Sequence, residues 1–181
     1  MVSRAYLVVL VAERLIELWL SKRNAARAFA RGGVEVGQAH YRVMTAFHTL
    51  FLVACALEAR PFEPALFFPF LAGALGAQAL RWWAIASLGD RWNTRVIVVP
   101  GDEPVTKGPY RYLKHPNYLA VVIELFCVPM MMGAYFTAVV FSLGNAALLW
   151  VRIRAEERAL GDKWQQAFAG KSRLMPGGPR G

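Results

Sequence analysis

Two short polar segments carry the residue types that binding and catalysis need. Residues 108–118 combine a Gly-Pro turn, three tyrosines and a histidine, followed by a Pro-Asn pair that suits a helix start. Residues 152–160 place Glu156 and Glu157 among arginines. An imidazole can act as a general base, carboxylates bind cations, and guanidinium groups orient anions. The alternatives are a solvated basic loop for the first segment and a charged helix surface for the second.

Other patterns limit the class of chemistry. Cys55 and Cys127 each stand alone in an apolar stretch, so we expect two core residues and no metal site. No Gly-rich turn follows a strand pattern, which disfavours a doubly wound nucleotide-binding sheet. The net charge is +9, yet only 18% of the 181 residues are charged and 56% are hydrophobic. Long apolar runs separated by basic clusters favour a bilayer over a nucleic acid as the partner.

The apolar runs must position these segments, and a bilayer crossing takes roughly 20 mostly apolar residues. The sequence predicts an all-α, polytopic membrane helical bundle with about five transmembrane helices. The predicted spans are residues 5–20, 43–57, 64–88, 118–132 and 135–151. Only Gly133 and Ala134 separate the last two spans, which predicts a helical hairpin.

The first run contains Glu13, Arg14 and Glu17, which are costly in hydrocarbon unless they pair or face the bundle interior. Their spacing of three and four residues puts them on one side of a helix. A helix that lies on the membrane surface is the alternative.

The basic residues set the predicted orientation. Most of the 21 Lys and Arg residues lie in the loop after the first span, around the 89–117 connector and beyond residue 151. Because positively charged loops stay cytoplasmic, we expect the N-terminus outside and the connector in the cytoplasm. One domain is predicted over residues 1–181, with three spans in 1–88, a functional part in 89–170 and a loose end at 177–181.

Further polar residues are expected to face the bundle interior. Asn145, Arg152 and Glu156 share one helix face because they are seven and four residues apart. Glu124 lies inside a predicted span and requires a partner or a cavity. The possible partners are Arg14 and Arg81.

Several ring-bearing side chains have simpler expected roles. His40 and His48 belong to the second span and its approach, and we expect them to be structural. Trp164 and Phe168 are expected to anchor an amphipathic tail helix at the membrane surface. Trp92 fits an interfacial aromatic belt as well as a functional site.

The order of the motifs resembles that of the isoprenylcysteine carboxyl methyltransferase family and its phospholipid methyltransferase relatives. Those proteins carry Val-Thr-x-Gly-x-Tyr, then Arg-His-Pro-x-Tyr, then paired glutamates after the last span. Here the corresponding motifs lie at 105–110, 114–118 and 156–157, and the resemblance covers about residues 80–168. Their order around a helical hairpin is specific, although each motif alone is common. Lys114 replaces the family's arginine and lacks its bidentate fork, and Ala120 replaces a frequent glycine.

The resemblance implies that S-adenosylmethionine is the cofactor, held in a cytoplasmic pocket between the 89–117 connector and the C-terminal helix. The cofactor-binding residues that it implies are Gly108, Tyr110, Lys114, His115, Pro116, Tyr118, Glu156 and Glu157. The catalytic residues expected are Arg154, Arg152 and His115. The substrate-binding residues expected are Trp92, Asn93, Arg95 and Glu124.

The methyl acceptor stays open between two chemistries. A carboxylate is already ionised and needs an arginine to orient it, whereas a hydroxyl needs a general base, His115 or a glutamate. We expect a lipophilic acceptor, which is an isoprenoid, a prenylated or prenylcysteine-like compound, or a phenolic lipid. Membrane lipids are the other expected partners, with no nucleic acid and no metal. The alternatives are a phospholipid N-methyltransferase, a noncatalytic membrane scaffold or transporter, and a membrane reductase.

Overall fold

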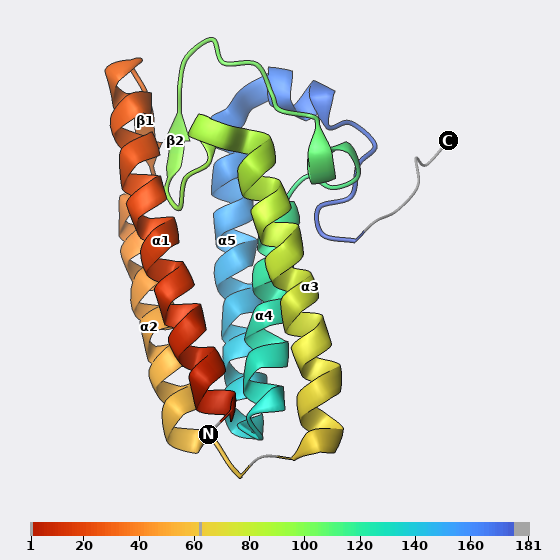
Figure 1. The fold of residues 1–181 in the computed structure, drawn as a ribbon. Helices are drawn as coiled ribbons and strands as arrows, with labels where there is room; N and C mark the ends of the chain where they lie inside the picture. The colour runs from red at the N-terminus through yellow and green to blue at the C-terminus, as the bar shows by residue number, and fades with distance from the viewer. Residues whose placement is uncertain (1, 62, 176–181) are drawn as a thin grey trace.

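The computed structural model describes residues 2–61 and 63–175, so the predicted loose end at 177–181 lies outside the described residues. Within that part, five α-helices form an elongated bundle, and the long connection between α3 and α4 lies at one end of it (Figure 1). The helices are α1 Val2–Ala30, α2 Gln38–Glu58, α3 Pro64–Leu88, α4 Pro116–Met131 and α5 Tyr135–Ala167. We call the end that holds residues 89–115 the connector end.

The predicted helical hairpin is confirmed, and a neighbouring helix stabilises its turn. Gly133 adopts a positive φ of 68° between α4 and α5, a conformation that glycine tolerates. The Glu58 carboxylate at the end of α2 accepts hydrogen bonds from the backbone N–H groups of Phe136 and Thr137, at 2.9 and 2.8 Å. These are unpaired donors in the first turn of α5, so Glu58 caps that helix from another element.

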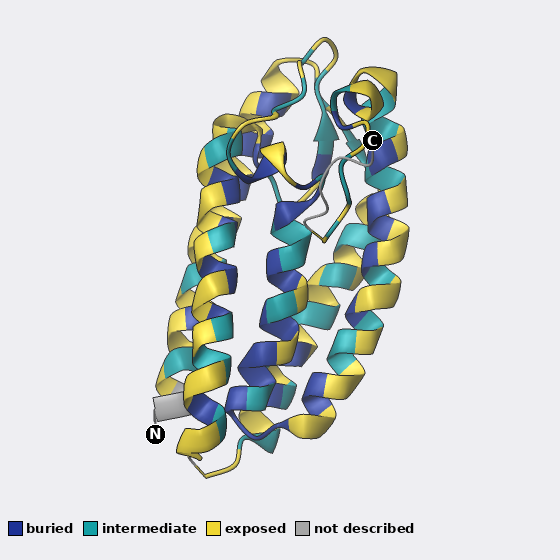
Figure 2. Cartoon of the chain, turned by 90° about the vertical axis from the view of Figure 1, so that its right-hand side faces the viewer, coloured by how far each residue is buried: buried dark blue, intermediate teal, exposed yellow. Residues whose placement is uncertain are grey.

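Apolar side chains cover the outside of the bundle, and Figure 2 shows exposed residues along the outer faces of its helices. Val8, Leu50, Phe68 and Leu143 are each more than half exposed, for example. Two described helices, α2 and α5, are long and apolar enough to cross a membrane, and α4 is a shorter apolar helix. A lipid-facing exterior explains this distribution, which is unusual for a protein surrounded by water.

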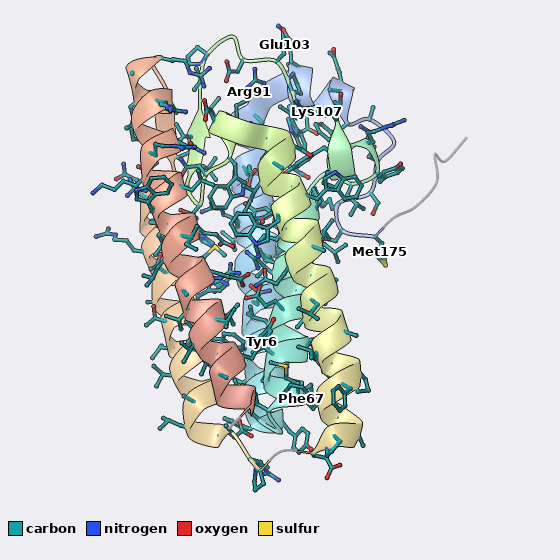
Figure 3. All side chains as sticks on the ribbon, in the orientation of Figure 1. Tyr6, Phe67, Arg91, Glu103, Lys107 and Met175 are labelled. Atoms are coloured by element: carbon teal, nitrogen blue, oxygen red, sulfur yellow. The ribbon has the colours of Figure 1, made fainter. Side chains whose placement is uncertain are left out.

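Most charged side chains of the described residues lie in the bundle interior and at the connector end, while a few, including Glu58 and Glu63, lie at the opposite end. In Figure 3, Arg91, Glu103 and Lys107 lie at the connector end, whereas Tyr6 and Phe67 lie toward the opposite end.

A buried ion-pair network joins three helices. Arg81 of α3 forms an ion pair with Glu124 of α4, and both side chains are about 95% buried. Arg14 of α1 pairs with Glu17 at 2.7 Å and reaches Glu124 at 3.5 Å. Glu17 also lies 3.6 Å from the Arg81 guanidinium. Both partners expected for Glu124 are therefore confirmed, and so is the interior placement of Arg14 and Glu17.

A small antiparallel sheet that the sequence did not predict holds the connector to the loop after α1. Strand β1, Val34–Val36, pairs with β2, Val96–Val98, so that Val34 faces Val98 and Val36 faces Val96. Strands of three residues are too short to give a recognisable alternation in the sequence. The connector also contains two short 3-10 helices, η1 Gly89–Arg91 and η2 Gly108–Arg111.

The last helix departs from the prediction at Gly161. α5 continues well beyond residue 151, and Gly161 then adopts a non-helical φ of 72° that bends the chain. After this bend Trp164 and Phe168 pack with Ala84 of α3 and with Tyr110. The prediction that these two aromatic residues anchor a tail helix on the membrane surface is wrong, because the bend turns them into the protein.

The ion-pair network predicts that removing Arg81 alone costs more stability than removing Arg81 and Glu124 together. Arg81→Met leaves the buried carboxylates of Glu17 and Glu124 to share Arg14 and should lower the free energy of unfolding by about 3–5 kcal/mol. Arg81→Met combined with Glu124→Leu keeps the Arg14–Glu17 pair and should recover most of that loss. Unfolding of the detergent-solubilised protein measures both. As a control, Arg27→Gln breaks an exposed pair with Asp90 and should cost less than about 1 kcal/mol. Additive losses in the double variant would contradict the prediction.

The close packing of Gly108 against α3 predicts that an alanine there lowers stability more than an alanine at Gly101. Gly108 has a φ of 59°, and an added Cβ would overlap Ser87 and lie 3.1 Å from Trp83 Nε1. Gly101 also has a positive φ, 83°, but an added Cβ there meets nothing within 4 Å. Gly108→Ala should therefore destabilise the protein by about 1–3 kcal/mol more than Gly101→Ala, as an overpacked contact does. Equal melting temperatures for the two variants would show that η2 does not pack tightly on α3.

Candidate active site

One cavity of about 760 Å³ begins at the connector end and continues into the bundle. Its volume lies within the range of small-molecule sites, roughly 300–1,000 Å³. The connector and the end of α5 line it, as the sequence predicted, but so do α1, α2, α3 and the start of α4. Residues of its wall used below are Arg14, Glu17, Tyr41, Thr45, His48, Thr49, Arg81, Trp92, Asn93, Thr94, Arg95, Tyr110, Lys114, His115, Tyr118, Arg152, Glu156, Trp164 and Phe168.

Aromatic rings form the wall at the connector end. Trp164 and Phe168 stack with their centroids 4.6 Å apart. The His115 ring lies 5.5 Å from Trp164 and 5.3 Å from Tyr118. Lys114 places its ammonium 5.8 Å from the Trp164 ring, within the distance of a cation–π contact. This end of the cavity therefore offers flat apolar surfaces beside a cation.

A chain of hydrogen bonds joins four residues of the cavity wall. Arg152 donates from Nε to the Tyr118 hydroxyl at 3.0 Å and from Nη2 to the Thr94 carbonyl oxygen at 2.7 Å. The Tyr118 hydroxyl in turn donates to the Glu156 carboxylate. The segments 108–118 and 152–157 therefore meet at the connector end of the hairpin, and they bring an acid, a phenol and a guanidinium together.

Behind the wall, His115 is held by a second glutamate. His115 Nε2 lies 3.1 Å from Glu157 Oε1, and both residues are buried. Arg173 forms a two-bond fork with the same carboxylate, with Nε 3.0 Å from Oε1 and Nη2 2.6 Å from Oε2. Glu156 faces the cavity, whereas Glu157 is occupied by His115 and Arg173.

The connector is positioned by polar residues of α1. Ser21 donates from its hydroxyl to Asn93 Oδ1 at 2.8 Å, and Asn93 donates back to the Ser21 carbonyl oxygen at 3.1 Å. Asn24 donates to the Trp92 carbonyl oxygen at 2.8 Å. Arg95 pairs with Glu35 at 3.4 Å and covers the Tyr41 ring. Trp92, Asn93 and Arg95, predicted on the substrate side, thus line the cavity and also fix the connector to α1, β1 and α2. The same prediction for Glu124 is wrong, because its carboxylate is held in the ion-pair network.

The inner end of the cavity lies among the helices. Arg14, Glu17 and Arg81 of the ion-pair network line it on one side, and α2 lines it on the other with His48, Thr45 and Thr49. Both threonine hydroxyls donate to backbone carbonyls one turn earlier, so they present mainly their methyl groups. His48 Nδ1 contacts the Met44 carbonyl oxygen at 2.8 Å. Glu124 lies behind Arg81 and does not line the cavity.

Three predicted cofactor residues contribute to the walls without lining the cavity. Gly108 forms the turn against Ser87, Pro116 is the buried first residue of α4, and Glu157 holds His115.

The prediction that Arg152 and Arg154 both act at the site is wrong for Arg154. It is exposed and lies over the Trp150 ring at 4.0 Å, away from the cavity. Two residues along a helix turn the side chain by about 200°, so Arg152 and Arg154 point in nearly opposite directions. Arg152 is the arginine that the structure brings to the cavity.

Burial keeps the Tyr110 hydroxyl protonated. Removal from water raises the pKa of Tyr110, and the negative charge of Glu156 raises it further. Tyr110 therefore serves this wall as a neutral phenol.

Several residues of the site were missed from the sequence. Tyr41 and Thr94 lie outside the motifs recognised in the sequence. Trp164 and Phe168 share one helix face by their spacing, and this pattern fits a helix on the membrane surface as well as a cavity wall. Arg173 lies beyond the last predicted helix, and only the fold brings it to Glu157. The Gly161 that redirects this segment was the one readable signal, because glycine inside a helical pattern marks a bend.

Comparisons with known proteins agree with this geometry. The sequence model of the Isoprenylcysteine carboxyl methyltransferase (ICMT) family matches residues 70–162. The chain is 39% identical over 157 residues to the uncharacterized protein YpbQ of Bacillus subtilis, which covers 85% of this chain and 94% of that protein. It is 27% identical over 157 residues to an uncharacterized protein of Haemophilus influenzae, covering 83% and 90% of the two chains.

The matched region runs from α3 through the connector and the hairpin to the Glu156–Glu157 pair, and so includes most of the cavity wall. The two apolar helices and the lipid-facing exterior agree with a membrane protein. The chain therefore belongs to the isoprenylcysteine carboxyl methyltransferase family of membrane methyltransferases.

Proposed function

We propose that this protein transfers a methyl group from S-adenosylmethionine to a carboxylate or hydroxyl oxygen of a lipophilic acceptor in the membrane. The observation that carries the proposal is one continuous cavity with two different ends. The connector end combines aromatic faces with charged groups, and the inner end lies inside a bundle that faces lipid. Direct methyl transfer requires the methyl donor and the acceptor to be aligned and water to be kept out of the site.

The connector end fits the chemical groups of S-adenosylmethionine. The stacked rings of Trp164 and Phe168 provide an apolar face for a flat base, and Tyr110 provides a neutral phenol beside it. The Glu156 carboxylate suits an ammonium or ribose hydroxyl group, and Lys114 suits a carboxylate. When bound, the cofactor supplies a methyl group activated by a positively charged sulfur.

Arg152 is the residue best placed to orient the acceptor oxygen. Its guanidinium is buried, lines the cavity between the two ends and is fixed by Tyr118 and Thr94. An acceptor carboxylate needs only this orientation, because it is ionised at neutral pH. An acceptor hydroxyl also needs a general base, and Glu156 and His115 are the bases on the same wall. An isoprenoid, prenylcysteine-like or phenolic lipid would place its apolar part among the helices.

We further propose that all five helices cross the membrane, with the N-terminus outside and the connector end in the cytoplasm. The apolar outer surface and the basic residues near the connector end support this orientation. α1 contains several charged residues and α3 contains Arg81. The buried ones, Glu17 and Arg81, face each other inside the bundle.

Cofactor binding is tested by calorimetry with S-adenosylhomocysteine on the purified protein in detergent. We expect binding of this product, no heat with NADPH, and at least about tenfold weaker affinity for Glu156→Gln, because a charge-assisted contact is lost. Glu63→Gln removes an equivalent charge at the opposite end of α3 and serves as the control. No heat from the unmodified protein would refute the proposed cofactor, and full affinity in Glu156→Gln would remove Glu156 from the site.

Acceptor orientation is tested by comparing two neighbouring arginines. Membranes that contain the protein are incubated with isotopically labelled S-adenosylmethionine at saturation, and mass spectrometry identifies the labelled lipid. Arg152→Lys should lower the rate of methyl incorporation about 100-fold, the effect of a misplaced reactant. Arg154→Lys makes the same change on the outer face and should stay within about twofold. Equal losses in the two variants would contradict the assignment.

A further inference from the structure

We infer that Arg173, outside the region matched by the family, is a positioning residue that fixes the orientation and tautomer of His115 through Glu157. This inference rests on the proposed function, in which His115 forms part of the cofactor wall. The segment that carries Arg173 follows the Gly161 bend and runs along the back of that wall. It would act on the site without entering the cavity.

Backbone contacts hold residues 171–173 against the turn before α4. Lys114 donates its N–H to the Ser172 carbonyl oxygen at 2.9 Å, and His115 donates its N–H to the Arg173 carbonyl oxygen at 3.1 Å. Lys171 donates to the Tyr110 carbonyl oxygen at 3.0 Å and lies over the Phe168 ring. The segment therefore has a fixed register relative to His115, which a loosely attached tail would lack.

The side chain of Arg173 also restrains His115, through Glu157. Its fork engages both oxygens of Glu157, the planar geometry in which arginine and carboxylate match best. Glu157 Oε1 then has one fixed direction from which it can accept from His115 Nε2. Since an ionised carboxylate only accepts hydrogen bonds, His115 must carry its proton on Nε2. Nδ1 of the neutral ring is then the nitrogen with the free lone pair.

This arrangement separates the roles of the two neighbouring glutamates. Glu156 lines the cavity and can contact a ligand, whereas Glu157 connects His115 to Arg173 and stays out of the cavity. A carboxylate that sets a histidine tautomer from behind is a known way to prepare an imidazole for proton transfer or hydrogen bonding. Removal of Arg173 should therefore change His115 before it changes the fold.

The test measures the histidine tautomer directly by NMR of the full chain labelled with ¹⁵N-histidine in detergent micelles. The chain has three histidines, so variants His40→Gln and His48→Gln identify the His115 signals by elimination. The Nε2–H tautomer is expected for His115 in the unmodified protein. Arg173→Gln should populate the Nδ1–H tautomer and weaken S-adenosylhomocysteine binding about tenfold. Arg158→Gln removes one exposed arginine from α5 and should leave both measurements unchanged.

Arg173→Lys keeps the charge but loses the fork, so it should give an intermediate tautomer ratio. If Arg173→Gln does not fold, Arg173→Lys is the variant that tests the inference. An unchanged His115 tautomer and unchanged affinity in a folded Arg173 variant would overturn the inference. The tautomer can be read without any ligand, so failure of the unmodified protein to bind S-adenosylhomocysteine would refute the proposed function separately.

Discussion

Arg81 and Glu124 lie as an ion pair inside a bundle whose outer surface is apolar, and this pairing constrains the rest of the structure. An unpaired charge in such an interior costs several kcal/mol, so α1, α3 and α4 are stable only where their charges meet. The alignment of α1 then decides where Ser21 and Asn24 lie. Because these residues hold Trp92 and Asn93, the ion pairs inside the bundle indirectly position the connector wall of the cavity.

Two different kinds of contact hold the cavity wall together. Tyr118 and Arg152 project from two helices joined by a tight hairpin, so their hydrogen bond depends on helix packing alone. Trp164 and Phe168 instead reach the wall only because Gly161 bends the chain. The backbone hydrogen bonds of Ser172 and Arg173 with the turn before α4 then hold the segment after the bend in place.

The sequence predicted those features that depend on residue type and short spacing. The hairpin follows from two apolar runs around Gly133, and the partners of Glu124 follow from the cost of an unpaired charge in a span. Features that depend on long-range packing were not readable. The three-residue strands carry no periodic signal, Arg173 reaches Glu157 through a bend, and the opposite directions of Arg152 and Arg154 were overlooked although their spacing implies them. The family motifs identified Glu156 and Glu157 but could not distinguish their surroundings.

The contacts of α1 also have a consequence for the order of folding. Ser21 meets Asn93 across 72 residues of chain, and Arg14 meets Glu124 across 110. The α4–α5 hairpin closes over a few residues and pays little loop-closure entropy, whereas these distant pairings cannot form until the intervening helices are in place. The hairpin, with Tyr118 and Arg152 already facing each other, should thus form early. The connector would then close over it last, when α1 docks.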